Sequence, residues 1–422
     1  MLYSFAKILM TAGLRFFYRH IYVTGFENIP ATGPAIIIAN HNSSLMDAAL
    51  LGILLKRKAW FFARGDVFVN KPVQKILWWM HMMPVHSHQG GKKTLDANHD
   101  SFSSGQQILS AGGIIVFFPE SYSHIEHQLL PFRKGVFRLA FDTATEHHFS
   151  FDIPIIPVGI TYDDPVACRT TVQVHADKPL LLSAYKDEYK HNAAAALLHI
   201  CKDAQQAVNK LVLHVINKNR LPTLEHYLAL SRMDADAGGP WKIKSREKLL
   251  REQQICQDIN QASGIHFETK KQKAGHYFST LTAVRLDDKK AKEAIRFSAG
   301  KIVLLIIGFP FYLVGLLLNG LPVLIGRTIA DKKVLRKDFY SWIFVACCAV
   351  IYFLWLLILF TTMAFAGWLY AFGLLLLMIG TGIFAYAYHG WLQEIRWQKR
   401  WKRLPADKRK ELLTGRQQLI RL

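Results

Sequence analysis

The segment at residues 40–47, NHNSSLMD, brings together side chains that can carry out acid–base chemistry. It follows the apolar run AIIIA at 35–39, which predicts a buried strand, and it precedes a stretch that predicts a helix. His41 can take a proton from an alcohol when a carboxylate holds its other ring nitrogen, and Asp47 can supply that carboxylate. Two residues six apart on one continuous helix do not face each other. We therefore expect His41 to lie in a loop before a helix that Ser44 caps.

The same spacing also fits a purely structural arrangement. Asp47 stands at the third position of the predicted helix, where an acidic residue can complete a capping box. His41 would then be an ordinary loop residue. The spacing alone does not choose between these two interpretations.

Short β-branched runs alternate with helical patterns over the first 220 residues, which indicates an α/β domain. Strands are predicted at 35–39, 59–63, 113–118 and 153–162, and helices at 45–56, 72–82, 94–111 and 134–147. Ligands of open α/β sheets collect where strands end, and a helix start favours a phosphate. The polar residues at these places predict a site for a phosphorylated alcohol, with His41 and Asp47 as catalytic residues and with Asn40, Arg64, Glu120, Ser121, Arg133 and Lys134 as substrate-binding residues.

Four blocks, NHNSSLMD, FFAR, FFPES and IPIIPVGI, occur in this order in the first 165 residues. Together they resemble the sequence blocks of the glycerolipid acyltransferases, a family that includes glycerol-3-phosphate and lysophosphatidate acyltransferases. The resemblance covers most of residues 30–165 and implies a mixed sheet flanked by helices. It also implies that His41 is a general base oriented by Asp47, that Arg64 binds the acceptor phosphate and that Glu120 helps to hold the glycerol. Arg133 and Lys134 match the basic pair that follows the third block.

The reaction implied by this resemblance is direct acyl transfer from acyl-CoA or an acyl-carrier protein to a hydroxyl of glycerol 3-phosphate, with no cofactor and no metal ion. The alternative within the class is acylation of lysophosphatidate or another lysophospholipid. Two features depart from the commoner pattern. Five residues instead of four separate His41 and Asp47, which resembles a bacterial and fungal branch that acylates glycerol 3-phosphate or dihydroxyacetone phosphate. Ser121 also replaces the usual glycine, and its side chain can narrow the acceptor pocket.

Two other classes of function remain open at this stage. A metal-dependent phosphoesterase would use His41, Asp47, His124 and His127 as ligands, and a chelator would abolish its activity. A membrane adaptor without catalysis would keep its function after His41→Ala.

The chain has 422 residues, a formal net charge of +21 and a hydrophobic fraction of 51%. Such a basic chain favours anionic partners. The basic residues concentrate beside apolar segments, so we expect membrane lipid, a thioester donor and a phosphorylated glycerol as partners, and no nucleic acid.

Five cysteines without regular spacing indicate free thiols in a reducing compartment. The first 20 residues do not fit a signal peptide and predict an amphipathic helix.

The last third of the chain predicts a membrane segment. No Asp, Glu, Lys or Arg occurs from 339 to 388, which is enough for two spans, at 339–363 and 366–388. The run at 302–326 contains two prolines and an Asn-Gly pair, which fits either a kinked span or a re-entrant hairpin, and the prolines favour the hairpin. The predicted domains are an acyltransferase α/β domain at 1–220, a charged helical region at 221–298 and a membrane segment with a basic tail at 299–422.

Basic segments flank the two predicted spans on both sides, and such segments stay in the cytoplasm. We therefore expect an integral protein of the cytoplasmic membrane with its catalytic domain on the cytoplasmic side, provided that 302–326 does not cross.

Overall fold

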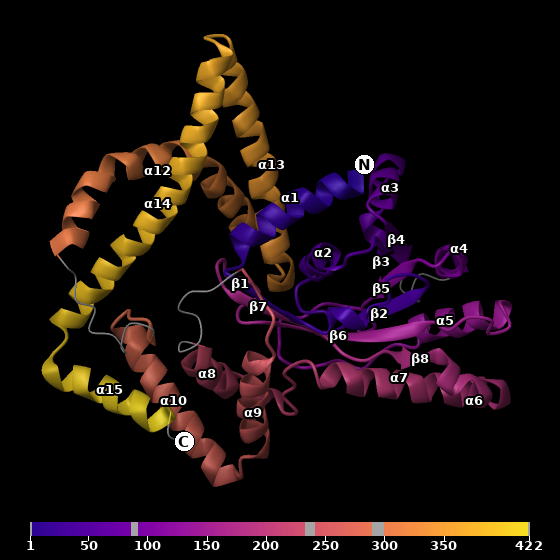
Figure 1. The fold of residues 1–422 in the computed structure, drawn as a ribbon. Helices are drawn as coiled ribbons and strands as arrows, with labels where there is room; N and C mark the ends of the chain where they lie inside the picture. Colours follow the sequence, from indigo (N-terminus) through magenta and orange to yellow (C-terminus); the bar gives the residue numbers. More distant parts are fainter. Residues whose placement is uncertain (1, 86–91, 233–240, 289–298, 421–422) are drawn as a thin grey trace. The chain divides into compact units, whose positions relative to one another are not determined.

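The computed structural model describes residues 2–85, 92–232, 241–288 and 299–420 (Figure 1). The chain forms two compact units. The first comprises Met1–Ile216, Gly238–Cys256 and Lys337–Trp342, and the second comprises Asn217–Ala237, Gln257–Arg336 and Ile343–Leu422. The first unit thus takes in two segments from far along the chain, in addition to most of the predicted domain at 1–220.

A mixed sheet forms the centre of the first unit, as the sequence predicts, with the strand order β4-β3-β5-β2-β6-β7-β1-β9. Strands β4, β3, β5, β2 and β6 are parallel, β7 is antiparallel to β6, β1 and β9 are parallel to β7, and β8 pairs with β6. The strands are β1 (His20–Thr24), β2 (Ala35–Ala39), β3 (Ala59–Arg64), β4 (Met82–Val85), β5 (Ile114–Phe117), β6 (Pro154–Tyr162), β7 (Thr171–Ala176), β8 (Leu180–Leu181) and β9 (Lys242–Ile243).

Helices cover both faces of this sheet. Helices α1 and α2 lie on one face, and α5 and α7 lie on the other (Figure 1). All five residues of β2 are buried, as a parallel strand covered on both faces requires. The helices of this unit are α1 (Leu2–Phe17), α2 (Leu45–Leu54), α3 (Lys71–Trp79), α4 (Lys92–Ser110), α5 (Gly135–Glu146), α6 (Lys186–His191) and α7 (Ala193–Asn209), and α9 (Glu247–Gln261) continues into the second unit.

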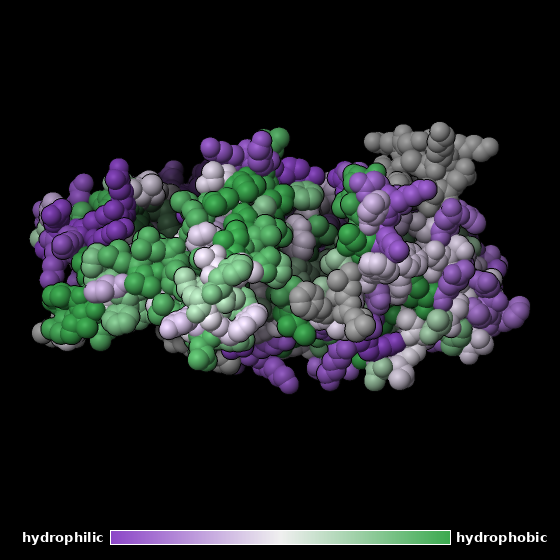
Figure 2. Space-filling view, turned by 90° about the horizontal axis from the view of Figure 1, so that it is seen from above, coloured by the Kyte–Doolittle hydropathy of each residue, from purple (hydrophilic) through white to green (hydrophobic). Residues whose placement is uncertain are grey.

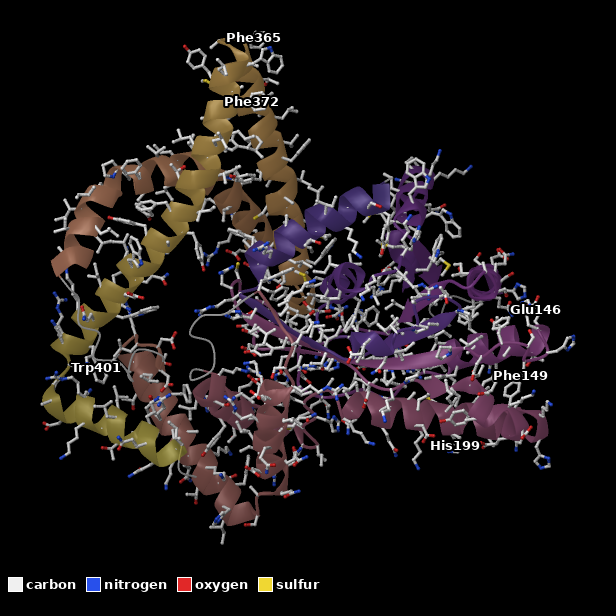
Figure 3. The ribbon with its side chains drawn as sticks, in the orientation of Figure 1. Glu146, Phe149, His199, Phe365, Phe372 and Trp401 are labelled. Carbon is white, nitrogen blue, oxygen red and sulfur yellow. The ribbon has the colours of Figure 1, made fainter. Side chains whose placement is uncertain are left out.

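The second unit is helical. Three of its helices are long and apolar enough to cross a membrane, at Ile302–Lys333, Lys337–Ala364 and Trp368–Arg403, which indicates a membrane-embedded protein. Hydrophobic side chains gather on the surface of these helices (Figure 2), and Phe365 and Phe372 are exposed near the α13–α14 turn (Figure 3). The helices are α8 (Leu221–Arg232), α10 (Gly264–Ala283), α12 (Ala299–Lys333), α13 (Lys337–Ala364), α14 (Trp368–Arg403) and α15 (Ala406–Ile420).

Residues 302–326 form the kinked helix and not the hairpin, because α12 is one helix of 35 residues with Pro310 and Pro322 inside it. A proline cannot donate to the carbonyl four residues before it. For Pro322 that carbonyl belongs to Leu318, and it accepts a hydrogen bond of 2.8 Å from Trp355 Nε1 on α13. This contact satisfies the carbonyl that the proline leaves unpaired, so the helix continues. Figure 1 shows α12 as an arc, consistent with bending at prolines.

Candidate active site

His41 and Asp47 meet at the junction of β2 and α2. The chain leaves β2 after Ala39, and α2 begins at Leu45, so His41 lies in the intervening loop. Its Nδ1 is 2.8 Å from Asp47 Oδ2, and the two side chains are 19% and 0% exposed. The carboxylate can only accept, so Nδ1 carries the proton and Nε2 keeps its lone pair when the ring is neutral. Nε2 forms no hydrogen bond with any residue that the structure describes, which leaves it free to take a proton.

Asp47 contacts both His41 and the backbone of the turn before α2. Its Oδ2 also accepts a hydrogen bond of 2.8 Å from the backbone N–H of Ser43, so it caps the turn before the helix while it orients His41. Ser44 occupies the N-cap position, but its side chain makes no capping bond and its φ is +44°. The predicted N-cap position of Ser44 is therefore confirmed, but the Asp47 carboxylate and not the Ser44 side chain bonds to the turn.

Tyr162 is the residue that sequence reasoning missed. Its hydroxyl donates to Asp47 Oδ1 at 2.5 Å. Burial first, and then the charge of Asp47, raises the pKa of Tyr162 well above its usual value, so the phenol stays protonated. Tyr162 is the last residue of β6, which is parallel to β2. Parallel strands end at the same edge of a sheet, so this position could have indicated that Tyr162 lies near His41 and Asp47.

Glu120 holds the backbone beside His41. It is 2% exposed, and its Oε1 accepts a 2.9 Å hydrogen bond from the backbone N–H of His41. Its Oε2 accepts from the backbone N–H of Leu130 at 2.9 Å and lies 3.1 Å from His124 Nε2. Both oxygens of the carboxylate that the family resemblance assigns to the glycerol are therefore bonded within the protein.

Asn40 links two strands. Its Oδ1 accepts from the Ile160 N–H at 2.7 Å, and its Nδ2 donates to the Ile160 carbonyl at 2.8 Å and to Asn42 Oδ1. The side chain is buried and extends the β2–β6 pairing beyond Ala39. In this structure the Asn40 amide bonds to the backbone of β6 and does not face an open binding site.

Arg64 does not join the His41–Asp47 pair. It ends β3, and β5 lies between β3 and β2, so strand spacing puts its backbone about 10 Å from that of the His41 loop. Its guanidinium bonds to Asp66, with Nε–Oδ1 at 3.2 Å and Nη2–Oδ2 at 2.5 Å, and both side chains are exposed. The structure thus shows a His41–Asp47 pair, with Arg64 further along the same edge of the sheet.

The remaining predicted residues are exposed near this edge. Ser121 has a φ of +71°, in the left-handed region where glycine is favoured, which gives a backbone reason for the glycine usual in the family. The backbone N–H of Arg133 donates to the Pro119 carbonyl at 2.8 Å. This hydrogen bond holds the backbone of Arg133 next to the residue that precedes Glu120, and Lys134 follows directly. Lys134 occupies the N-cap position of α5. Both cations can therefore reach an anion at this edge.

The alternative metal site has no counterpart among the described residues. No group of three or more His, Cys, Asp and Glu side chains in this part of the chain could hold a metal ion. His41 bonds to Asp47 and His124 to Glu120, so the expected ligands form separate pairs.

The comparisons with known proteins find similarity to acyltransferases. Residues 20–161 match the family model described as Acyltransferase. The chain is similar to the 1-acyl-sn-glycerol-3-phosphate acyltransferase BAT2 of Brassica napus, at 28% identity over 158 residues, which are 37% of this chain and 41% of the relative. It is also similar to LPAT1 of Arabidopsis thaliana, which has the same descriptive name, at 30% identity over 141 residues, which are 33% of this chain and 37% of the relative.

Among solved structures, the chain is similar to the 1-acyl-sn-glycerophosphate acyltransferase PlsC of Thermotoga maritima, with 19% identity and a TM-score of 0.35, over 47% of this chain and 78% of that one. The chain spans about two fifths of the length of the two plant relatives. The segment that matches the acyltransferase family model, residues 20–161, contains His41, Asp47 and Glu120.

Proposed function

We propose that this protein transfers a fatty acyl group from a thioester to a free hydroxyl of a glycerol phosphate ester. The observation that carries the proposal is the 2.8 Å contact between His41 Nδ1 and Asp47 Oδ2, with Nε2 unbonded among the described residues, in an acyltransferase-family domain. A base held in this way contributes about 10²- to 10⁴-fold in rate.

The proposed reaction needs no covalent enzyme intermediate, because a thioester is already activated. His41 Nε2 takes the hydroxyl proton as the alcohol oxygen attacks the thioester carbonyl. The C–S bond of the tetrahedral intermediate then breaks, and the thiolate receives the proton back from His41. Acyl-CoA or an acyl-carrier protein is therefore a co-substrate, and the products are a new ester and a free thiol.

Three cations at this edge are suited to the acceptor phosphate. Arg133 and Lys134 stand at the start of α5, where the helix dipole adds to their charge. Among the described residues, the Arg64 guanidinium bonds to Asp66 alone, in an exposed ion pair, and such pairs contribute about 0–1 kcal/mol. A substrate phosphate can therefore displace Asp66 at small cost.

We propose lysophosphatidate as the acceptor, because the two plant relatives are named as 1-acylglycerol-3-phosphate acyltransferases. This choice reverses the order expected from the sequence alone. Glycerol 3-phosphate is the second candidate, favoured by the five residues between His41 and Asp47.

The test uses the purified full chain in detergent micelles with palmitoyl-CoA and either acceptor, with thiol release and ester product measured together. We expect product with lysophosphatidate, a smaller yield with glycerol 3-phosphate and no effect of a chelator. Equal thiol release with no acceptor would contradict acyl transfer, and loss of activity with the chelator would favour the phosphoesterase alternative.

We also propose that α13 and α14 cross the bilayer as a pair and that α12 enters and leaves on one side. The first turn of α13, Lys337–Trp342, belongs to the first unit, where Asp338 accepts a hydrogen bond from Ser123 and Ser341 donates to the Pro165 carbonyl. The opposite end of α12 is joined to the first unit by residues 257–298, which contain no apolar stretch long enough to span. Both ends of α12 would then lie on the side of the catalytic domain.

This topology puts the basic ends Lys332–Lys333 and Arg400–Arg403 on the same side, which the positive-inside rule assigns to the cytoplasm of a cytoplasmic membrane. Single cysteines at Ala366, Lys333, Lys186 and Lys408, in a variant without the native cysteines, test it by labelling sealed vesicles with a membrane-impermeant maleimide. We expect Ala366→Cys to react from the outer face and the other three from the inner face. Labelling of the Lys333 and Lys186 positions from opposite faces would show that α12 crosses.

A further inference from the structure

We propose that Tyr162 is a positioning residue for the His41–Asp47 pair, because its hydroxyl fixes the orientation and the charge of the carboxylate that holds the imidazole. The catalytic consequence rests on the proposed acyl transfer. The effect of Tyr162 on the orientation of Asp47, and on how strongly the His41–Asp47 pair holds its proton, does not depend on that reaction.

The contacts of Asp47 are divided between its two oxygens. Oδ2 accepts from His41 Nδ1 and from the Ser43 N–H, each at 2.8 Å, and both donors belong to the loop before α2. Oδ1 accepts from Tyr162 at 2.5 Å, and this donor comes from β6. Tyr162 therefore ties the carboxylate to the sheet, so that the group cannot turn about its Cβ–Cγ bond without losing a hydrogen bond.

Tyr162 is itself held firmly. It is 2% exposed, pairs with Val172 of β7 in the sheet and packs with the ring of Tyr18 at a centroid distance of 6.0 Å. A donor on a buried strand is placed more precisely than one on a loop. The raised pKa of this phenol, due to burial and then to Asp47, also keeps its proton in place throughout the range in which an imidazole titrates.

Removal of the hydroxyl changes the pair in two ways. Asp47 is fully buried, and without Tyr162 its Oδ1 has no donor among the described residues, so its negative charge is less well stabilised. The carboxylate then holds the imidazolium proton more tightly, and His41 becomes a free base only at higher pH. The carboxylate also gains freedom to rotate, which takes the imidazole out of its orientation for part of the time.

The test compares Tyr162→Phe with Tyr185→Phe in the full-length protein. Tyr185 provides a matched control because its hydroxyl donates to a carboxylate, Asp203 Oδ2 at 2.7 Å, in the same unit, and it is also buried. For Tyr162→Phe we expect kcat to fall about 10- to 100-fold, with KM for both substrates changed less than about threefold. The acid limb of the pH profile of kcat/KM should move up by about one unit. Tyr185→Phe should leave kcat and the pH profile at their wild-type values.

A second measurement does not depend on activity. Diethyl pyrocarbonate reacts with the unprotonated imidazole, and mass spectrometry of the peptide that contains His41 gives the extent of reaction at each pH. His41 is 19% exposed at its side chain and within reach of the reagent. We expect the labelling midpoint of His41 to rise in Tyr162→Phe and to stay unchanged in Tyr185→Phe.

If Tyr162→Phe is not recovered in folded form, 3-fluorotyrosine is placed at position 162 by codon suppression. It keeps the shape and the hydroxyl but is a stronger donor, so the His41 midpoint should fall. The proposal is overturned if the pH midpoint of His41 labelling does not move in either variant. It is also overturned if the variants change only thermal stability and leave kcat and the labelling midpoint as in the wild type. A wild-type protein without acyl transfer, but with the expected labelling shifts, would refute the proposed function and leave the role of Tyr162 standing.

Discussion

Arg64 shows how one residue of the site can be tested apart from the chemistry. Its guanidinium is bonded to Asp66 on the surface, and a phosphate has to replace that carboxylate if Arg64 binds the acceptor. For Asp66→Asn we predict a KM for lysophosphatidate about two- to fivefold lower, because the competing ion pair contributes no more than about 1 kcal/mol. For Arg64→Ala we predict a KM at least about tenfold higher, because a charged hydrogen bond is lost. Initial-rate kinetics at varied acceptor concentration measure both effects.

The control is Glu268→Gln, which breaks an ion pair with Lys271 of similar exposure in the second unit. It should leave KM unchanged. An unchanged KM in Arg64→Ala would exclude Arg64 from phosphate binding.

The site residues differ in how far the sequence could predict them. His41 and Asp47 are close in the chain, and a single helix start brings them together, so their contact could be predicted from local sequence. The spacing alone did not distinguish a catalytic pair from a capping residue beside a loop histidine. Tyr162 is 115 positions from Asp47, and only the sheet brings it there. The sequence also did not show that Asn40 and Glu120 are used to bond the backbone of the site, because a polar residue at a strand end looks the same whether it faces a ligand or the protein.

At the scale of elements, His175 makes the pairing of β1 and β7 sensitive to pH. It is fully buried on β7 and its Nδ1 is 2.8 Å from Thr24 Oγ1 on β1. Burial, followed by the charge of Arg246, lowers the pKa of His175 from 6.5 to about 4. Between these values the unfolded chain binds a proton that the folded chain does not, so the folded state loses stability as pH falls from 6.5 towards 4, by up to about 3 kcal/mol.

We therefore predict that the apparent melting temperature in detergent falls more steeply between pH 6.5 and pH 4.5 in the wild type than in His175→Gln, which cannot titrate. His191→Gln, an exposed change, is the control and should follow the wild type. Parallel curves for wild type and His175→Gln would show that His175 is protonated without cost.

Asn319 links the three apolar helices. Its Nδ2 donates to the Met378 carbonyl of α14 at 3.2 Å, and its Oδ1 accepts from the Tyr352 hydroxyl of α13. For Asn319→Leu we predict a loss of about 1 kcal/mol, in the range measured for hydrogen bonds between membrane helices. The midpoint of unfolding in mixed detergent measures it. Thr328→Val removes a hydroxyl that, among the described residues, bonds to its own helix alone, at Leu324, and it should cost less. Equal losses in the two variants would argue against a link between helices.

The elements that the sequence predicted best are those with a strong local pattern. The strands β2, β3, β5 and β6 and the helices α2, α3, α4 and α5 all occur within a few residues of the expected ranges. The strands β1, β4, β7, β8 and β9 were missed. The partners of β1 are β7 and β9, which come from distant parts of the chain. The hairpin at 302–326 was wrong because Trp355 satisfies the carbonyl of Leu318, and that contact cannot be read from the prolines.

At the scale of the whole molecule, the two units are not divided by sequence order. The first unit includes the start of α13, whose Asp338 and Ser341 bond to loops that follow β5 and β6. These strands end at the same edge as β2, where His41 lies, so the start of an apolar helix is tied to the edge that carries the site. The domain boundaries predicted from composition separate the start of α13 from the α/β domain, because they assign residue 338 to the membrane segment at 299–422.

The central claim is that His41 is the base for acyl transfer, and the most direct measurement is the rate of palmitoyl transfer from palmitoyl-CoA to lysophosphatidate by wild type, His41→Ala and His199→Ala. His199 lies exposed on α7 in the same unit, and it controls for loss of an imidazole (Figure 3). We predict that His41→Ala lowers kcat by at least about 10²-fold with its fold intact, while His199→Ala keeps the wild-type rate. Transfer by His41→Ala at the wild-type rate would contradict the account.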